Sequence, residues 1–254
     1  MSESSSVRDR AAPMRPAGAL SPVYSFMKNP TLVDYPGKLA VMLFLSGCNF
    51  RCGFCHNAGL MAERRDGLPW SRLQSACTEF AANWVDAAVI SGGEPTLHPQ
   101  IEDLIAFLRG RGWGVKLDTN GSRPDVLERV LPAVDYVAMD VKAGFSRYGE
   151  LTGAADTHGV RRSIELIKTR ARDHEFRTTV IDGFHDAEQM REIAAAVSGA
   201  KRWILQPFVP RDDLPDPRLR RTPRTSRETL EAYRDELRPV AGPVAVRGDD
   251  LLET

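Results

Sequence analysis

Three cysteines lie within eight residues, at Cys48, Cys52 and Cys55, in the pattern C-x3-C-x2-C. Cysteine thiolates are the usual ligands of iron–sulfur clusters, and a cubane contains four irons. Three thiolates therefore leave one iron without a protein ligand, and that iron can chelate a small molecule. Gly47 and Gly53 favour a loop here rather than a continuous helix. The motif predicts one [4Fe–4S] cluster held by a single loop.

Zinc is the alternative metal for this cluster of thiols. A structural zinc site takes four protein ligands, often as two C-x2-C pairs. The fourth ligand here would have to be His56, Cys77 or a distant residue. We expect Cys77 to be a core residue, because it falls on the apolar stripe of a predicted helix and free cysteine packs as a small hydrophobe. The spacing therefore favours iron–sulfur over zinc.

Further polar residues gather where predicted strands end. Taken singly, each group could be a turn, a helix cap or a surface ion pair. Ligand sites in parallel α/β folds lie at the carboxyl ends of strands, so six polar groups at one end predict a single site. Besides the cysteines, the candidate residues are Gly92, Gly93, Glu94, Pro95, Asp118, Thr119, Asn120, Asp140, Lys142, Arg177 and Gln206.

The elements that would position these residues alternate along the chain. Short apolar runs predict buried strands at 39–45, 87–90, 114–117, 136–141, 176–181 and 203–205. Helical spacing of apolar residues predicts helices at 71–85, 100–109, 124–131, 158–169, 186–197 and 225–237, with a short strand at 244–247. The alternation predicts an α/β fold with a parallel sheet, which is either an open doubly wound sheet or a (β/α) barrel.

Composition narrows the class of protein. The 254 residues contain 34 Lys plus Arg and 34 Asp plus Glu, so no charge excess points to nucleic acid. No segment approaches the ~18 apolar residues of a membrane span. Residues 1–20 have no apolar core and are expected to be a disordered leader rather than a secretory signal. We expect a cytoplasmic protein with one domain at 21–254, its core at about 30–210 and a C-terminal loop and helix at 211–254.

The motifs together are similar to those of a known superfamily. The cysteine pattern, with Phe54 before its last cysteine and Gly-Gly-Glu-Pro at 92–95, resembles the radical S-adenosylmethionine (SAM) superfamily. The wider likeness is to activating enzymes of glycyl radical enzymes, above all the long type of anaerobic ribonucleoside-triphosphate reductase activating protein. It covers about residues 30–210 and rests on segments 32–38, 55–57, 118–121, 139–142, 151–153 and 177–180.

This resemblance implies a fold and a reaction. The fold is an incomplete (β/α)6 radical SAM barrel. The three cysteines bind three irons, and the amino and carboxylate groups of SAM chelate the fourth. An electron from the reduced cluster cleaves SAM to methionine and a 5′-deoxyadenosyl radical. That radical takes a hydrogen atom from a glycine of the partner enzyme.

The resemblance also assigns roles around SAM. Gly92 and Gly93, followed by Glu94 and Pro95, allow the backbone to approach the SAM ammonium group, for which Glu94 supplies a carboxylate. Phe54 lies beside the cluster, where it can stack near the adenine.

The remaining roles concern charge. Asp118, Thr119 and Asp140 resemble an acidic pocket in which related activators hold a monovalent cation. Asn120 is expected to help there or to reach the ribose.

The cations Lys142 and Arg177 are expected to neutralise the SAM carboxylate or the nearby acids. Gln206 stands where related formate-lyase activators have a histidine, and it is the candidate for the ribose contact.

Two partners are implied. The target is a glycyl radical enzyme. Because only Cys77 remains outside the motif, this chain is not expected to hold a second cubane. The electron should therefore come from a flavodoxin or a ferredoxin.

Two alternatives remain at this point. One is a radical SAM enzyme acting on a small molecule in modified-nucleoside or cofactor synthesis, which a pocket closed by residues 211–223 would favour. The other is an iron–sulfur electron carrier or zinc-stabilised binding module without turnover, which leaves residues 92–95 unexplained.

Overall fold

The centre of the fold is a single curved β-sheet. The computed structural model describes residues 18–61 and 65–247. The eight strands follow chain order across the sheet, so each strand pairs with its sequence neighbours. The strands are β1 (Ser25–Phe26), β2 (Ala40–Leu45), β3 (Ala87–Gly92), β4 (Gly114–Thr119), β5 (Tyr136–Asp140), β6 (His174–Val180), β7 (Trp203–Pro207) and β8 (Val244–Val246).

The sheet is an incomplete barrel. Strands β2 to β8 are parallel, and β1 pairs antiparallel with β2. Within the described chain β1 and β8 are the two edges and do not pair with each other. The predicted strands correspond to β2 to β7 and to β8, whereas β1 was not predicted. This α/β arrangement confirms the expected incomplete barrel.

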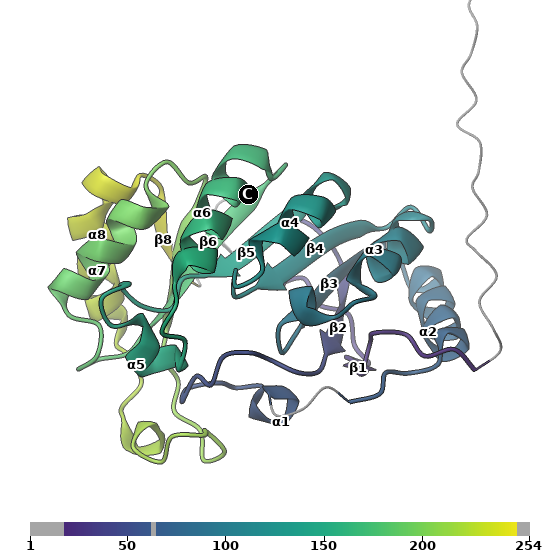
Figure 1. Ribbon diagram of the computed structural model, residues 1–254, viewed down its shortest axis with the longest axis horizontal. Coiled ribbons are helices and arrows are strands. Elements are labelled where there is room, and N and C mark those ends of the chain that lie inside the picture. Colours follow the sequence, from purple (N-terminus) through teal and green to yellow (C-terminus); the bar gives the residue numbers. More distant parts are fainter. Residues whose placement is uncertain (1–17, 62–64, 248–254) are drawn as a thin grey trace, which may run out of the picture.

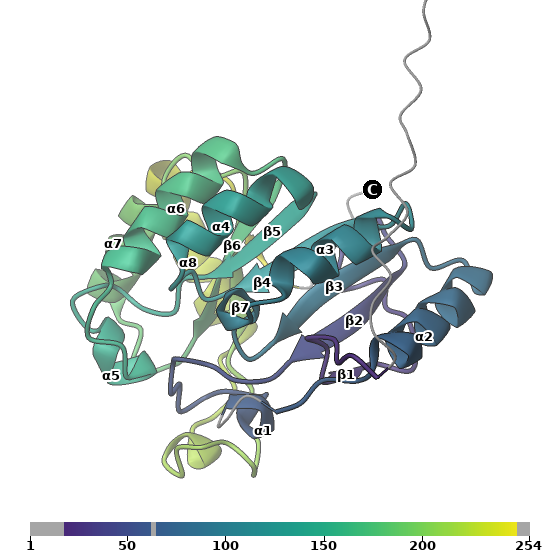
Figure 2. The same cartoon turned by 45° about the vertical axis from the view of Figure 1, so that its right-hand side comes forward.

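Helices accompany this sheet, the long ones on its outer face and the two short ones, α1 and α5, beyond its lower end in the views of Figures 1 and 2. They are α1 (Ala58–Met61), α2 (Trp70–Ala82), α3 (Ile101–Arg109), α4 (Pro124–Val130), α5 (Tyr148–Thr152), α6 (His158–Arg170), α7 (Ala187–Val197) and α8 (Arg227–Ala241). Caps fix where some of them begin: the Asp186 carboxylate accepts the Gln189 N–H at the start of α7. Periodicity predicted the long helices to within a few residues, but it missed α1 and α5, which are too short to show a period.

Side-chain alternation divides each strand between two environments. On β2, Val41, Leu43 and Leu45 pack in the main core with the helices, whereas Ala40 and Met42 face a smaller cluster of their own. That smaller cluster also contains Tyr136 and Ala138 of β5. The second set lines the inside of the barrel, where the polar residues at the strand ends also lie.

The chain ends differ in part from the expected boundaries. Most of the predicted leader at 1–20 lies outside the described residues, but Leu20 forms a β-bridge with Pro69, so described structure begins before residue 21. The loop at 211–223 contains a short 3-10 helix, Leu219–Arg221, and a fully buried Leu214. No helix among the described residues has the length and apolar character needed to cross a membrane.

Candidate active site

A cavity of about 620 Å³ opens at the carboxyl ends of the strands. Cys48, Cys52 and Cys55 all line it. Most of the other predicted residues line it too, namely Phe54, Gly92, Gly93, Asp118, Thr119, Asn120, Asp140, Lys142, Arg177 and Gln206. The prediction of one site across six strand ends is therefore matched by one cavity.

The cysteine loop between β2 and α1 is braced by its own backbone. The Phe50 N–H donates to the Cys48 sulfur at 3.4 Å, and the Cys55 N–H donates to the Cys52 carbonyl at 3.2 Å. The Arg51 guanidinium donates to the carbonyls of Cys48 and Phe50, at 2.6 and 2.9 Å. The Arg51 N–H in turn donates to the carbonyl of Thr152 at the end of α5. These contacts fix the backbone of the loop, and all three cysteines line the cavity.

Burial changes the acidity of these thiols. It raises the pKa of Cys48 and Cys55, and it raises the pKa of Cys52 to about 11. The metal-free thiols are therefore protonated at neutral pH, and ligation to a metal must release their protons. Cys77 lies elsewhere, buried in the core on α2, as predicted.

The described residues do not form a ready-made zinc site. No three His, Cys, Asp or Glu side chains among them lie close enough together to hold one metal ion. His56, the nearest candidate for a fourth zinc ligand, has its Nε2 3.1 Å from the carbonyl of Val209.

Gly92 and Gly93 line the cavity, where their approach to the SAM ammonium group stays a prediction, and they also pack against the cysteine loop. A Cβ on Gly92 would lie 2.2 Å from the Leu45 carbonyl oxygen, and one on Gly93 would lie 2.1 Å from that of Gly47. Gly92 also has φ 118°, which disfavours any side chain. The Gly93 N–H donates to the Leu45 carbonyl at 2.8 Å. The space beside both glycines is thus filled by the backbone that leads into the cysteine loop.

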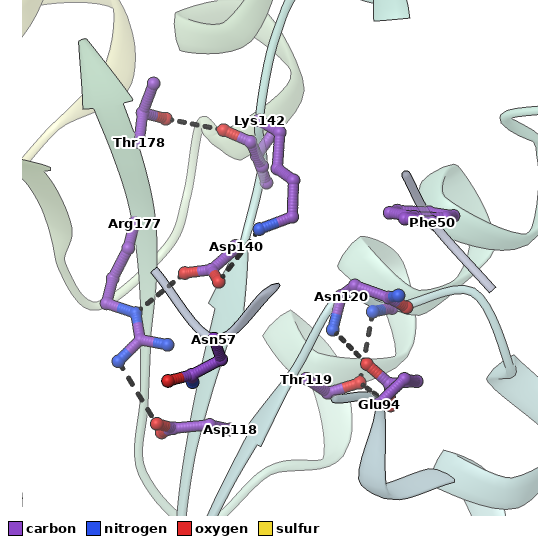
Figure 3. A network of polar contacts seen from close by, with 12 residues as sticks. Phe50, Asn57, Glu94, Asp118, Thr119, Asn120, Asp140, Lys142, Arg177 and Thr178 are labelled. Atoms are coloured by element: carbon purple, nitrogen blue, oxygen red, sulfur yellow. Dashed lines mark hydrogen bonds and ion pairs between the residues drawn. The ribbon is translucent and has the colours of Figure 1, made fainter. Parts of the chain in front are cut away.

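Glu94 does not face the cavity, which corrects its expected role toward the SAM ammonium group. Its side chain is buried, and one oxygen accepts from the Thr96 N–H at 3.0 Å, the Thr119 hydroxyl at 2.8 Å and the Thr96 hydroxyl. The other oxygen accepts the Asn120 N–H at 2.6 Å (Figure 3). Burial raises the pKa of Glu94, although these hydrogen bonds oppose the rise.

With every oxygen engaged by protein donors, the carboxylate ties the loop after β3 to the end of β4. Pro95 also lies outside the cavity lining, because it is buried at the start of a short 3-10 helix, Pro95–Leu97.

An alternating set of charges crosses the barrel interior (Figure 3). Arg177 donates to Asp140 at 2.9 Å and lies 3.5 Å from Asp118. Lys142 donates to the other oxygen of Asp140 at 3.1 Å. Burial alone would raise the pKa of Asp140, but the charges of Arg177 and Lys142 lower it well below its usual range. The same pairing raises the pKa of both cations despite their burial. All three groups are therefore charged at neutral pH.

Two further predicted residues contact the cysteine loop directly. The Asn120 amide donates to Asn49 at 3.1 Å and lies 3.8 Å from the Cys48 sulfur. The Lys142 ammonium lies 5.6 Å from the centroid of the Phe54 ring. The polar residues Asn120 and Lys142, which follow β4 and β5, thus lie against the loop that carries the thiols.

Other residues line the cavity that sequence reasoning did not select. The sequence could have identified Thr179, because this residue follows Arg177 by two positions on the same strand and therefore faces the same side of the sheet. Asp34 lies in the matching segment 32–38 but was not selected as a site residue, and Arg247 follows the last strand; the two side chains approach each other at 3.8 Å. The remaining additions are Met42, Phe44, Phe50, His56, Asn57, Met61, Ser91, Pro207, Val209 and Arg224.

Comparison with known proteins agrees with this site. The family model described as the Radical SAM superfamily matches residues 42–197. The chain belongs to the radical SAM superfamily, and it is a radical SAM enzyme by fold and motif. This family uses a [4Fe–4S] cluster and SAM, and three thiols bordering one cavity suit that use.

Individual relatives point in more than one direction. A Methanocaldococcus jannaschii protein named "Putative glycyl-radical enzyme activating enzyme" is 34% identical over 188 residues, which cover 71% of this chain and 77% of that protein. The 7-carboxy-7-deazaguanine synthase of Aquifex aeolicus is 31% identical over 104 residues, 41% of this chain and 45% of that enzyme.

Among solved structures, Streptococcus suis SuiB bound to S-adenosylmethionine aligns with a TM-score of 0.64 at 15% identity. The alignment covers 82% of this chain and 52% of that one. At that identity the likeness shows the fold alone.

Proposed function

We propose that this enzyme generates a glycyl radical on a partner enzyme, and that the partner is an anaerobic ribonucleoside-triphosphate reductase. The observation that carries the proposal is the 34% identity to a relative named as an activating enzyme, spread over 77% of that relative's length. The incomplete barrel is consistent with it, since an open edge suits a large protein substrate. The cavity is lined from both edge regions of the sheet, by Phe44 on β2 and by Arg247 after β8.

In this proposal Cys48, Cys52 and Cys55 hold the cluster, each as a thiolate after loss of its proton. When bound, the reduced cluster and SAM supply a 5′-deoxyadenosyl radical that can take a hydrogen atom from glycine. Arg51 fixes the loop by holding the carbonyls of Cys48 and Phe50.

The charged residues orient SAM. Lys142 and Arg177 line the cavity and place positive charge where the SAM carboxylate would lie. Asp118 and Asp140 are already paired with these cations, so a monovalent cation would share both carboxylates with them.

The remaining cavity residues shape the nucleoside end of the site. Phe54 offers a ring face for the adenine, and Gln206 offers an amide for the ribose. Glu94 acts indirectly, because its carboxylate holds Thr119 and Asn120 in place rather than touching SAM.

The experiment is to mix the reconstituted enzyme anaerobically with SAM, reductant and an anaerobic ribonucleoside-triphosphate reductase. We expect a glycyl radical signal by electron paramagnetic resonance. A reductase with its radical-site glycine changed to alanine should give none. Cleavage of SAM without any protein radical would contradict the proposed target.

A second candidate is catalysis on a small molecule, favoured by the match to 7-carboxy-7-deazaguanine synthase over 104 residues. That match covers less than half of either chain, so we rank it second. Transfer of deuterium from a labelled small substrate into 5′-deoxyadenosine would support it.

A further inference from the structure

The segment after β7 packs against the outside of the cysteine loop. The Asp216 N–H donates to the Gly53 carbonyl at 3.1 Å, between the second and third cysteines. A Cβ on Gly53 would lie 2.8 Å from the Cβ of Asp216, so the two backbones are in close contact. At the far end of the segment, the Thr225 hydroxyl donates to the carbonyl of Val180 at 2.6 Å. The position of this segment relative to the thiols is therefore fixed.

Residues 218–224, here called the arginine segment, carry a concentrated positive charge. The sequence there is Arg-Leu-Arg-Arg-Thr-Pro-Arg, with four arginines and no acid. The Arg218 side chain is 90% exposed, although it pairs with Asp216 at 2.8 Å. Arg220 donates to the carbonyl of Leu214, which anchors the segment. The side chains of Arg221 and Arg224 are exposed, and neither makes a hydrogen bond or ion pair to another described residue.

Most of the arginines in this segment lie outside the cavity. Only Arg224 lines it, whereas Arg218, Arg220 and Arg221 lie outside its lining. Figures 1 and 2 show the segment, in yellow-green, on the same side of the molecule as α1 and α5. A protein that contacts the three outer arginines reaches the cysteine loop without entering the cavity that the glycine must enter.

A protein that binds at this segment could supply the electron that the cluster needs. Each reductive cleavage of SAM consumes one electron, and the only cysteine outside the motif is Cys77, which is buried on α2. The electron must therefore come from another molecule that approaches the cysteine loop from outside. A positive surface at that point attracts an acidic partner and raises its rate of encounter.

We propose that the arginine segment is the docking surface for an acidic one-electron donor protein of the flavodoxin or ferredoxin type. This inference rests on the family's cluster chemistry and on the external donor in the proposed function. It adds where the donor binds and which charges hold it.

The test compares three double variants. Arg218→Glu with Arg221→Glu reverses the charge and leaves the anchor Arg220 in place. Arg218→Lys with Arg221→Lys keeps the charge. Lys28→Glu with Arg72→Glu makes the same charge change at exposed residues remote from the cysteine loop, where neither side chain has a described partner.

Two readouts separate docking from chemistry. The Kd for a flavodoxin of net negative charge is measured by titration at several salt concentrations. The rate of 5′-deoxyadenosine formation is measured once with reduced flavodoxin and once with dithionite. We expect the charge-reversed pair to bind flavodoxin about tenfold or more weakly, with a flatter salt dependence and unchanged dithionite-driven turnover. The lysine pair and the remote pair should both bind like wild type.

Several results would overturn the docking proposal. Unchanged flavodoxin affinity in the charge-reversed pair would place the donor's binding site elsewhere. Failure of flavodoxin to bind the wild-type enzyme would also contradict the proposal. Normal flavodoxin binding with lost dithionite-driven turnover would make the segment part of the active site. Normal SAM cleavage with both reductants but loss of glycyl radical transfer would assign the segment to the target enzyme instead. If wild type cleaves no SAM with dithionite, the radical SAM function itself fails, which is distinct from failure of the docking surface.

Discussion

The buried carboxylate of Glu94 accepts a hydrogen bond from the hydroxyl of Thr119 at 2.8 Å, joining the loop after β3 to the end of β4. The N–H of Asn120 donates to the same carboxylate at 2.6 Å. Asn120 then extends to Asn49 in the cysteine loop. One carboxylate therefore connects three strand-end segments that line or support the cavity.

Removal of this carboxylate should destabilise the protein. Glu94→Ala leaves buried donors of Thr96, Thr119 and Asn120 without an acceptor, at a cost of about 3 kcal/mol or more in the free energy of unfolding. Urea denaturation of the metal-free protein measures it. Glu102→Ala is the matched control, since Glu102 forms only an exposed pair with Arg129 and its loss should cost about 1 kcal/mol or less. Equal effects of the two variants would contradict the bridging role.

Gly93 should be intolerant of even one added carbon. In Gly93→Ala the new Cβ would lie 2.1 Å from the carbonyl oxygen of Gly47, so the cysteine loop must move away from β3. We expect a clear loss of iron bound per chain after anaerobic reconstitution. Gly59→Ala on α1 is the control, because a Cβ there meets nothing within 4 Å. Full iron loading of Gly93→Ala would show that the loop does not depend on this contact.

Arg177 should be needed for both stability and SAM binding. Arg177→Met leaves the buried carboxylates of Asp118 and Asp140 with less compensation, and breaking a buried ion pair costs about 3 kcal/mol. The pKa of Asp140 should rise toward its ordinary value. Calorimetric titration with SAM should show weaker binding than in Arg129→Met, which removes an exposed pair. Wild-type SAM affinity in Arg177→Met would remove Arg177 from the site.

Stability should fall in mild acid because of two buried histidines. Burial lowers the pKa of His185 and of His174 to about 4, whereas an unfolded histidine titrates near about 6.5. Between these values the unfolded chain binds more protons, so the free energy of unfolding decreases as pH falls through this window. The slope approaches about 1.4 kcal/mol per pH unit for each histidine.

Urea titrations between pH 7 and pH 5 measure this effect. His185→Gln should flatten the slope, since His185 donates through Nε2 to the Lys142 carbonyl but can accept the Ile181 N–H through Nδ1 only when its ring is neutral. A wild-type stability that stays constant over this range would contradict the account.

The sequence predicted the strands well because each is a short apolar run between breakers. It also placed the cysteine loop, since ligand type and spacing together specify a cluster. It did not predict α5 (Tyr148–Thr152), because five residues cannot show a helical period. The pairing of Asp34 with Arg247 was not predicted for a related reason: residues more than 200 positions apart meet only after folding.

The roles of the glycines and Glu94 show a second limit of sequence reasoning. The residues at 92–95 were expected to touch SAM, and of these Gly92 and Gly93 line the cavity whereas Glu94 and Pro95 do not. In the folded chain Gly92 and Gly93 are required by their contact with Leu45 and Gly47, and Glu94 is engaged by buried donors. A pattern shows that residues matter at a site, whereas only the structure separates contact with a ligand from support of the backbone.

The central claim is that Cys48, Cys52 and Cys55 carry a cluster that cleaves SAM. The most direct test is anaerobic reconstitution with iron and sulfide, addition of SAM and dithionite, and chromatographic assay of 5′-deoxyadenosine. Wild type and Cys77→Ala should both form it, since Cys77 is a core residue away from the cavity. The triple variant Cys48→Ala, Cys52→Ala, Cys55→Ala should form none. Failure of wild type to assemble a cubane, with zinc co-purifying instead, would contradict the claim.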